Sequence, residues 1–276
     1  MISDEFAVFV HSYQRLSFTT IKTLHRLNYT GKIYLQISDE DKYIEKYKEV
    51  VKDYKNVELI IYKKERDFDL MTNINDLRSQ AFAYNATIKI AKRLGLKYFL
   101  ILDDDYKNFY FKKGQGDNAS SKVKNLDNIF FALINFLKNT NIFCLSITQT
   151  GDQPYYRFNL FRKAMNFLLF ETKKIPDDFK FLGFTNEDVN TYLRYGNIGY
   201  IFLTYPQVTL RQTQTQKQEG GYTEVYIDYG TFYKSFFSVM VLPSACRVKF
   251  VSGVGRLHHF VKWDFAVPKI LPYKYN

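Results

Sequence analysis

Strand-like and helix-like segments alternate over the first hundred residues, and this pattern limits the fold of the chain more than any other feature. Short apolar runs predict four strands, at residues 6–10, 32–37, 57–62 and 98–102. Between them, apolar side chains recur every three or four residues and predict helices through Ile21, Leu24 and Leu27, over 41–55, and over 78–94. Such alternation predicts an α/β domain whose parallel strands form the core of one sheet.

An acidic run, Asp103-Asp104-Asp105, directly follows the apolar segment 98–102. In open α/β sheets, ligands bind beyond the carboxyl ends of the strands, and the three aspartates occupy such an end. Mg²⁺ and Mn²⁺ prefer oxygen ligands and typically take one or two carboxylates together with substrate phosphates. The run therefore indicates a metal-diphosphate site, with a solvated acidic turn as the alternative.

Two later groups carry residue types that catalysis uses. Asn186-Glu187-Asp188 opens a predicted helix, so it is either an N-terminal cap with early acids or the source of a general base. His258 and His259 are adjacent. Neighbouring side chains on a strand point to opposite faces, so at most one of the two would ligate a metal simply.

Arg78 and Asn85 are seven residues apart, on one face of the helix that leads into the aspartate-bearing strand. The chain contains no Walker loop, no G-x-G-x-x-G fingerprint and no G-x-S-x-G elbow. Metal-assisted phosphate binding therefore has no glycine-loop competitor here.

The second part of the chain is less regular. Strands are expected at 142–147, 166–170 and 198–203, helices at 126–137, 188–195 and 230–241, and an exposed loop over the glutamine-rich stretch 209–221. No repeat or linker interrupts it. We expect a single domain over 1–276, with one half at 1–105 and the other at 106–276.

Charge is distributed unevenly between these halves. Residues 1–105 hold 17 Lys and Arg against 16 Asp and Glu, whereas residues 106–276 hold 22 against 12, so nearly all of the net charge of +11 lies in the second half. A polyanionic partner would explain this, and so would an ordinary Lys-rich surface. Two cysteines, no run near the ~20 apolar residues of a membrane span and no secretory signal predict a cytoplasmic protein.

Together these residues resemble glycosyltransferases of the GT-A fold. More narrowly, the chain is similar to phage-encoded TET-associated glycosyltransferases, which modify 5-hydroxymethylpyrimidines in DNA. The similarity extends over most of the chain and rests on the following segments: Ser12-Tyr13-x-Arg15, the aspartate run, 186–189, 220–223, 230–235, and 256–259 with Trp263. The resemblance implies a Rossmann-type nucleotide-sugar domain with a mixed central sheet and an elaborated C-terminal half. In it, residues 1–105 would be the nucleotide-sugar-binding half and residues 106–276 the acceptor-binding and catalytic half.

The resemblance also implies a role for each residue. Asp105 would ligate Mn²⁺ or Mg²⁺, Asp103 would approach the metal or the donor ribose, and one of His258 and His259 would complete the metal site. Asp188, with Glu187 as the substitute, would be the catalytic base of an inverting reaction. The remaining donor-binding residues would be Ser12, Tyr13, Arg15, Arg78, Asn85, Asp104, Gly220 and Gly221.

The implied donor is a UDP-sugar, with glucose favoured, and the implied acceptor is double-stranded DNA with hydroxymethylated pyrimidines, in the cytoplasm of a phage-infected host. Candidates for DNA contact are the basic residues Arg157, Arg162, Lys163, Lys173 and Lys174, near Tyr155 and Tyr156. Three alternatives remain open: a transferase acting on a surface glycan, protein or lipid, a DNA-binding accessory protein, and a nucleotidyltransferase. The sequence leaves the oligomeric state open.

Overall fold

A computed structural model describes residues 4–65, 76–112, 120–149, 163–212, 223–252 and 255–267. The strands are β1 (Phe6–His11), β2 (Lys32–Ser38), β3 (Val57–Tyr62), β4 (Tyr98–Asp103), β5 (Tyr106–Lys112), β6 (Ser120–Lys122), β7 (Ile142–Gln149), β8 (Phe167–Glu171), β9 (Ile201–Gln212), β10 (Cys246–Val251) and β11 (Arg256–Val261). The helices are α1 (Thr19–Arg26), α2 (Ile44–Val50), α3 (Ala81–Arg93), α4 (Leu126–Lys138), α5 (Glu187–Asn197), α6 (Thr223–Val241) and α7 (Trp263–Ala266).

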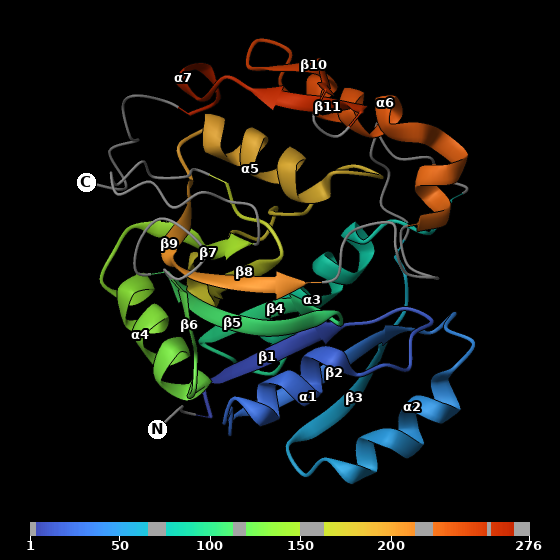
Figure 1. Cartoon of the computed structure of the whole chain (residues 1–276), viewed down its shortest axis with the longest axis vertical. Coiled ribbons are helices and arrows are strands. Elements are labelled where there is room, and N and C mark those ends of the chain that lie inside the picture. The colour runs from blue at the N-terminus through green and yellow to red at the C-terminus, as the bar shows by residue number, and fades with distance from the viewer. Residues whose placement is uncertain are drawn as a thin grey trace.

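Nine strands form one mixed sheet in the order β3-β2-β1-β4-β8-β7-β9-β5-β6 (Figure 1). The first four are parallel to one another. Strand β8 then runs antiparallel to both β4 and β7, and β9 is parallel to β7 but antiparallel to β5. The predicted Rossmann-type α/β domain with a mixed central sheet is confirmed.

Helices cover both faces of this sheet because the central strands are apolar on both sides. Val8 and Leu100 pack with α1, α2 and α4, whereas Phe9 and Phe99 pack with α3 and α5. Side chains alternate between the faces of a strand, so a strand buried on both faces has to be a continuous apolar run. Predicted and observed N-terminal elements differ by a few residues at most, and Gly95 has the positive φ of 68° expected after the end of α3.

The second half departs from the prediction in two ways. Strand β9 runs through Gln212, so residues 209–212 are not an exposed loop; Thr209 and Leu210 are buried between β5 and β7. The predicted helix at 230–241 instead begins at Thr223, with a break at Gly230, whose φ of 73° and ψ of 174° are not helical. The rest of the glutamine-rich stretch, 213–221, lies outside the described residues.

Strands β10 and β11 form a separate two-stranded antiparallel sheet, here called the ribbon. The ribbon lies beside α6 and over α5, at the end of the molecule away from α1 and α2 (Figure 1). The sequence did not predict it, nor β5 and β6. Within the described ranges, no helix combines the length and the apolar character that crossing a membrane requires.

Candidate active site

The acidic run lies at the carboxyl end of β4, as predicted, where the parallel strands β1, β2 and β4 all end. The backbone carbonyl of Asp103 accepts a 2.5 Å hydrogen bond from the Thr20 hydroxyl, and the carbonyl of Asp104 accepts the Thr20 N–H at 3.1 Å. The Tyr106 hydroxyl lies 3.2 Å from a carboxylate oxygen of Asp103 and donates to it. The turn that carries the three carboxylates is therefore held by contacts from α1 and β5.

The Asp104 carboxylate points to the segment that follows β1, and its contacts there do not favour binding of a diphosphate. Its carboxylate accepts a 2.6 Å hydrogen bond from Ser12 and a 3.0 Å ion pair from Arg15, and the residue is buried. Three residues predicted to bind the donor thus come together, but largely to bind one another. Tyr13, which was also predicted to bind the donor, has the Lys64 ammonium 5.3 Å from its ring centroid.

Two residues that the sequence analysis assigned no site role fix the segment after β1. The Tyr47 hydroxyl donates to the Arg15 carbonyl at 2.6 Å and accepts the Arg15 N–H at 3.0 Å. Asp41 accepts the N–H of Gln14 at 2.6 Å, where φ is 54°. Periodicity placed Tyr47 on the apolar stripe of α2, which is correct, but it could not reveal the second use of its hydroxyl.

Arg78 and Asn85 are engaged in structural contacts. The Arg78 guanidinium binds Asp76 through two nitrogens and Asp228 of α6 at 2.7 Å. The Asn85 amide donates to the Phe181 carbonyl at 3.1 Å and accepts the Phe181 N–H at 2.7 Å. Their assignment to the donor pocket remains a prediction that these contacts do not favour.

The carboxylates of the run repel one another in a largely buried site. Burial raises the pKa of Asp103 to about 8, and the charges of Asp105 and Asp104 add to the shift. Burial and the Asp104 charge raise the pKa of Asp105 to about 6. Nearby cations would reverse these shifts, so the site favours a positively charged ligand.

The second pair of carboxylates opens α5. Burial raises the pKa of Glu187 to about 8, followed in effect by the charge of Asp188 and, more weakly, by that of Asp103. Burial also raises the pKa of Asp188, whose carboxylate accepts the Val189 N–H at 2.7 Å. Because the Asp103 charge acts on Glu187, the fold brings the end of β4 and the start of α5 into one acidic site.

Asn186 joins this site to α6 and the ribbon. It precedes α5 in the left-handed conformation, with φ of 55°, and its side chain forms no cap, so the capping interpretation is wrong. Instead its amide nitrogen lies 3.0 Å from the Lys234 carbonyl, 3.2 Å from Ser238 Oγ and 3.2 Å from His259 Nδ1. A carbonyl can only accept, which identifies the Asn186 atom as the donor nitrogen, and Nδ1 of His259 accepts.

The two histidines lie together beside cations. Their ring centroids are 4.2 Å apart. Burial, then the charge of His258, lowers the pKa of His259 to about 3, with Lys234, Arg256 and Lys163 contributing. Burial, Lys234 and Arg256 lower the pKa of His258 as well. Both rings are therefore neutral near pH 7, as a metal ligand must be.

The predicted four-residue metal set is not assembled. Among the residues that the structure describes, no three His, Cys, Asp or Glu side chains converge as metal ligands. Asp103 and Asp105 still suit the metal, since Mg²⁺ and Mn²⁺ need only one or two carboxylates when phosphates supply further oxygens, and their mutual repulsion is relieved by a divalent cation. The histidines, beside Lys234 and Arg256, are less suited to such a site.

The predicted DNA contacts divide into three groups. Lys163 lies on the side of the acidic site, because its charge acts on Asp188 and His259. Lys173 and Lys174 lie at the other end of the central strands, away from the acidic run. They are next to Glu171, which pairs with Tyr98 at the start of β4. Arg157 and Arg162 lie outside the described residues, as do Gly220 and Gly221.

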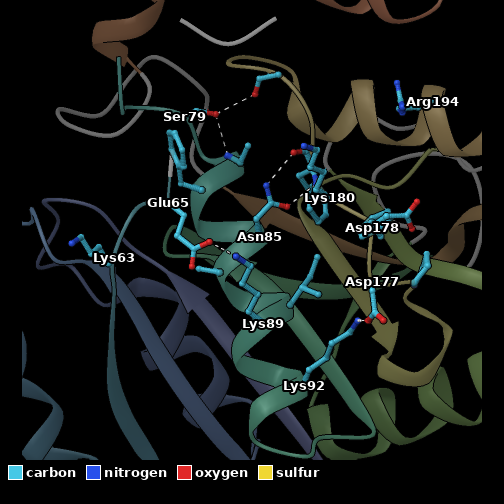
Figure 2. Close-up of a pocket in the computed structure, with 18 residues that line it drawn as sticks. Lys63, Glu65, Ser79, Asn85, Lys89, Lys92, Asp177, Asp178, Lys180 and Arg194 are labelled. Atoms are coloured by element: carbon cyan, nitrogen blue, oxygen red, sulfur yellow. Dashed lines mark hydrogen bonds and ion pairs between the residues drawn. The ribbon is translucent and has the colours of Figure 1, made fainter. Parts of the chain in front are cut away.

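A cavity of about 830 Å³ lies elsewhere, along α3. It extends from Ser79 to Lys92 between α3 and the segment 176–183, and Asp103, Asp105, Glu187 and Asp188 do not line it (Figure 2). Figure 2 shows that Lys89 and Lys92 each reach an acidic partner, Glu65 and Asp177 respectively. Two of its lysines are thus paired with carboxylates, and the cavity is separate from the acidic site described above.

The family model described as TET-Associated Glycosyltransferase matches residues 6–221. The chain belongs to this family. The matched range of this TET-associated glycosyltransferase contains both carboxylate groups. Residues 230–235 and 256–259, which contributed to the resemblance in sequence, lie beyond the match.

Solved structures provide further likenesses to this TET-associated glycosyltransferase. Residues 1–349 of S. aureus TarS in complex with UDP are 10% identical, with a TM-score of 0.46, over 75% of this chain and 60% of that one. GalNAc-T7 with UDP, GalNAc and Mn²⁺ is 12% identical, with a TM-score of 0.49, over 84% and 49%. A mycobacterial protein is 8% identical, with a TM-score of 0.48, over 93% and 83%.

The chain thus spans less than two thirds of the first two proteins. No protein with curated annotation matches the chain.

Proposed function

We propose that the chain transfers a sugar, with glucose favoured, from a UDP-sugar to the hydroxyl of 5-hydroxymethylpyrimidines in DNA, with Mn²⁺ or Mg²⁺ bound by Asp103 and Asp105. The observation that carries the proposal is the meeting of two acidic groups in one site, one at the end of β4 and one at the start of α5. UDP in TarS, and UDP with Mn²⁺ in GalNAc-T7, agree with this donor and metal.

The two groups divide the chemistry. A divalent cation on Asp103 and Asp105 would balance the charge of the donor diphosphate. Asp188 accepts the proton of the acceptor hydroxyl while the hydroxyl oxygen bonds to the anomeric carbon of the sugar. The bond from that carbon to the diphosphate oxygen breaks, and its electron pair leaves with UDP.

DNA as the acceptor rests on charge. The half of the chain that follows Asp105 carries a balance of +10, from 22 Lys and Arg against 12 Asp and Glu. Phosphate contacts supply most of the affinity of such proteins for DNA, and they need cations. The base 5-substituent lies in the major groove, where an enzyme can approach it. We place this reaction in the cytoplasm of a phage-infected host.

A single assay tests donor, acceptor and base together. The protein is incubated with Mn²⁺ or Mg²⁺, UDP-glucose and duplex DNA that contains hydroxymethyluracil or hydroxymethylcytosine, and the digested nucleosides are weighed. A hexose on one base is the expected result. UDP release without a modified base would redirect the search to glycan, protein or lipid acceptors. If neither UDP release nor a modified base is found with any nucleotide sugar tested, the proposed transfer is contradicted.

The pH profile identifies the base. The pKa of about 8 for Glu187 includes the charge of an already ionised Asp188, so Asp188 loses its proton first. If Asp188 is the base, kcat rises with pH as the Asp188 carboxyl, whose pKa burial raises, loses its proton, and Glu187→Gln leaves this limb in place. A limb near pH 8 that disappears in Glu187→Gln would assign the base to Glu187 instead.

A further inference from the structure

The ribbon has one face towards the active site and one towards solvent. Its register pairs Arg247 with Phe260, and alternation places Lys249 on the same face. All three are exposed, and both cations lie over the Phe260 ring, with Lys249 Nζ 4.0 Å and the Arg247 guanidinium carbon 5.3 Å from its centroid. We call Arg247, Lys249, Arg256 and Phe260 the outer face of the ribbon.

The outer face lies in a segment of the second half that carries basic residues but no acidic ones. From Tyr229 to Trp263 the chain has no Asp or Glu, and it has five cations: Lys234, Arg247, Lys249, Arg256 and Lys262. A surface of this kind repels other cations and has no internal acid to neutralise it. It is complementary to a polyanion.

The outer face also offers an aromatic ring. Phe260 is 43% exposed although it is apolar, and its neighbours are cations. Proteins that hold nucleic acids combine cations for phosphates with aromatic rings for bases. An acidic protein surface would use the cations but would gain less from the ring, so DNA suits the pair of features better.

The inner face fixes the position of this surface relative to the chemistry. His259, on the strand that carries Phe260, contacts Asn186 at 3.2 Å, and Asn186 directly precedes Glu187 and Asp188. The strand that carries Phe260 is therefore joined directly to the start of α5, where Glu187 and Asp188 lie.

We propose that the ribbon is the DNA-binding element of this enzyme, with its outer face in the major groove of the acceptor duplex. This inference rests on the proposed function. A two-stranded antiparallel ribbon fits the major groove, which is about 12 Å wide. The same groove displays the pyrimidine 5-substituent, so a ribbon that docks there brings the target hydroxymethyl group to the edge of the active site.

The test compares two double variants by fluorescence anisotropy with a hydroxymethylated duplex at several salt concentrations. Arg247→Gln/Lys249→Gln removes the two cations over Phe260. Lys42→Gln/Lys46→Gln is the matched control, because these lysines are also exposed and also lie over one ring, that of Tyr43, at 5.0 and 5.1 Å. We expect the ribbon variant to bind about ten-fold more weakly, with a salt slope smaller by about two. The control should bind as the wild type does.

Phe260→Ala provides a second, charge-neutral test, with an expected loss of about ten-fold in affinity at an unchanged salt slope. Both ribbon variants should keep the wild-type Tm and UDP release without acceptor. Equal duplex affinity and salt slope for wild type and both variants would overturn the ribbon inference while transfer to DNA still stood. Tight binding of DNA by the wild type without transfer would contradict DNA as the acceptor, while the ribbon would remain a DNA-binding site. Absence of wild-type DNA binding would overturn both.

Discussion

Replacing Asp188 by Asn is expected to lower kcat by about 10²- to 10⁴-fold, the usual contribution of a positioned general base. The amide cannot accept the acceptor proton, but its oxygen can keep the 2.7 Å hydrogen bond from the Val189 N–H. The start of α5 should therefore stay folded. Single-turnover transfer with saturating UDP-sugar and acceptor measures the loss directly.

Donor binding is the control for this variant. UDP-sugar affinity, measured by calorimetry, should match that of the wild type, because Asp188 acts on the acceptor and not on the nucleotide. Wild-type kcat in Asp188→Asn would remove the residue from the mechanism. A large loss of donor affinity would mean that it helps to hold the sugar.

Asp104→Ala and Asp105→Ala should differ in their effect on the free energy of unfolding, although the residues are adjacent. Asp104 is buried and holds Ser12 and Arg15, so its loss removes the carboxylate that pairs with the Arg15 guanidinium, which is 23% exposed. Breaking a buried pair costs about 3–5 kcal/mol, and the exposure of Arg15 favours the lower end. Urea denaturation should show a free energy of unfolding lower by about 3 kcal/mol.

Asp105→Ala, by contrast, removes a carboxylate that is repelled by Asp104 in a buried site. We expect its free energy of unfolding to be unchanged or higher, with transfer lost because a metal ligand is missing. Equal destabilisation by the two substitutions would contradict this division of the acidic run. Restored transfer at high Mn²⁺ in Asp105→Ala would confirm the metal role.

The N-terminal fold and the location of the acidic site could be predicted because both depend on local pattern. A buried parallel strand has to be apolar throughout, and 98–102 is; its end then places Asp103 at the edge where ligands bind. The ribbon could not be predicted in this way. Its strands alternate cations with apolar residues, and that pattern is equally typical of a solvated loop.

The partners of polar side chains were the least predictable part. Helical spacing put Arg78 and Asn85 on one face of a helix, but Arg78 precedes the start of α3. Their partners Asp228 and Phe181 lie 150 and 96 residues away in the sequence. Likewise, nothing local distinguishes Asp104 from Asp105. Only the approach of β1 beside β4, in register from Phe6 with Tyr98 to His11 with Asp103, gives Asp104 its two partners.

The amide of Asn186 has more acceptors than hydrogens. Its two N–H bonds face three acceptors, the Lys234 carbonyl, Ser238 Oγ and His259 Nδ1, all within 3.2 Å. One acceptor is always left over, so a small displacement of His259 costs no hydrogen bond, because Ser238 takes the released hydrogen. The contact between the ribbon and the active site can therefore accommodate a small shift of the ribbon without a change in the number of hydrogen bonds from Asn186, while α5 keeps its place.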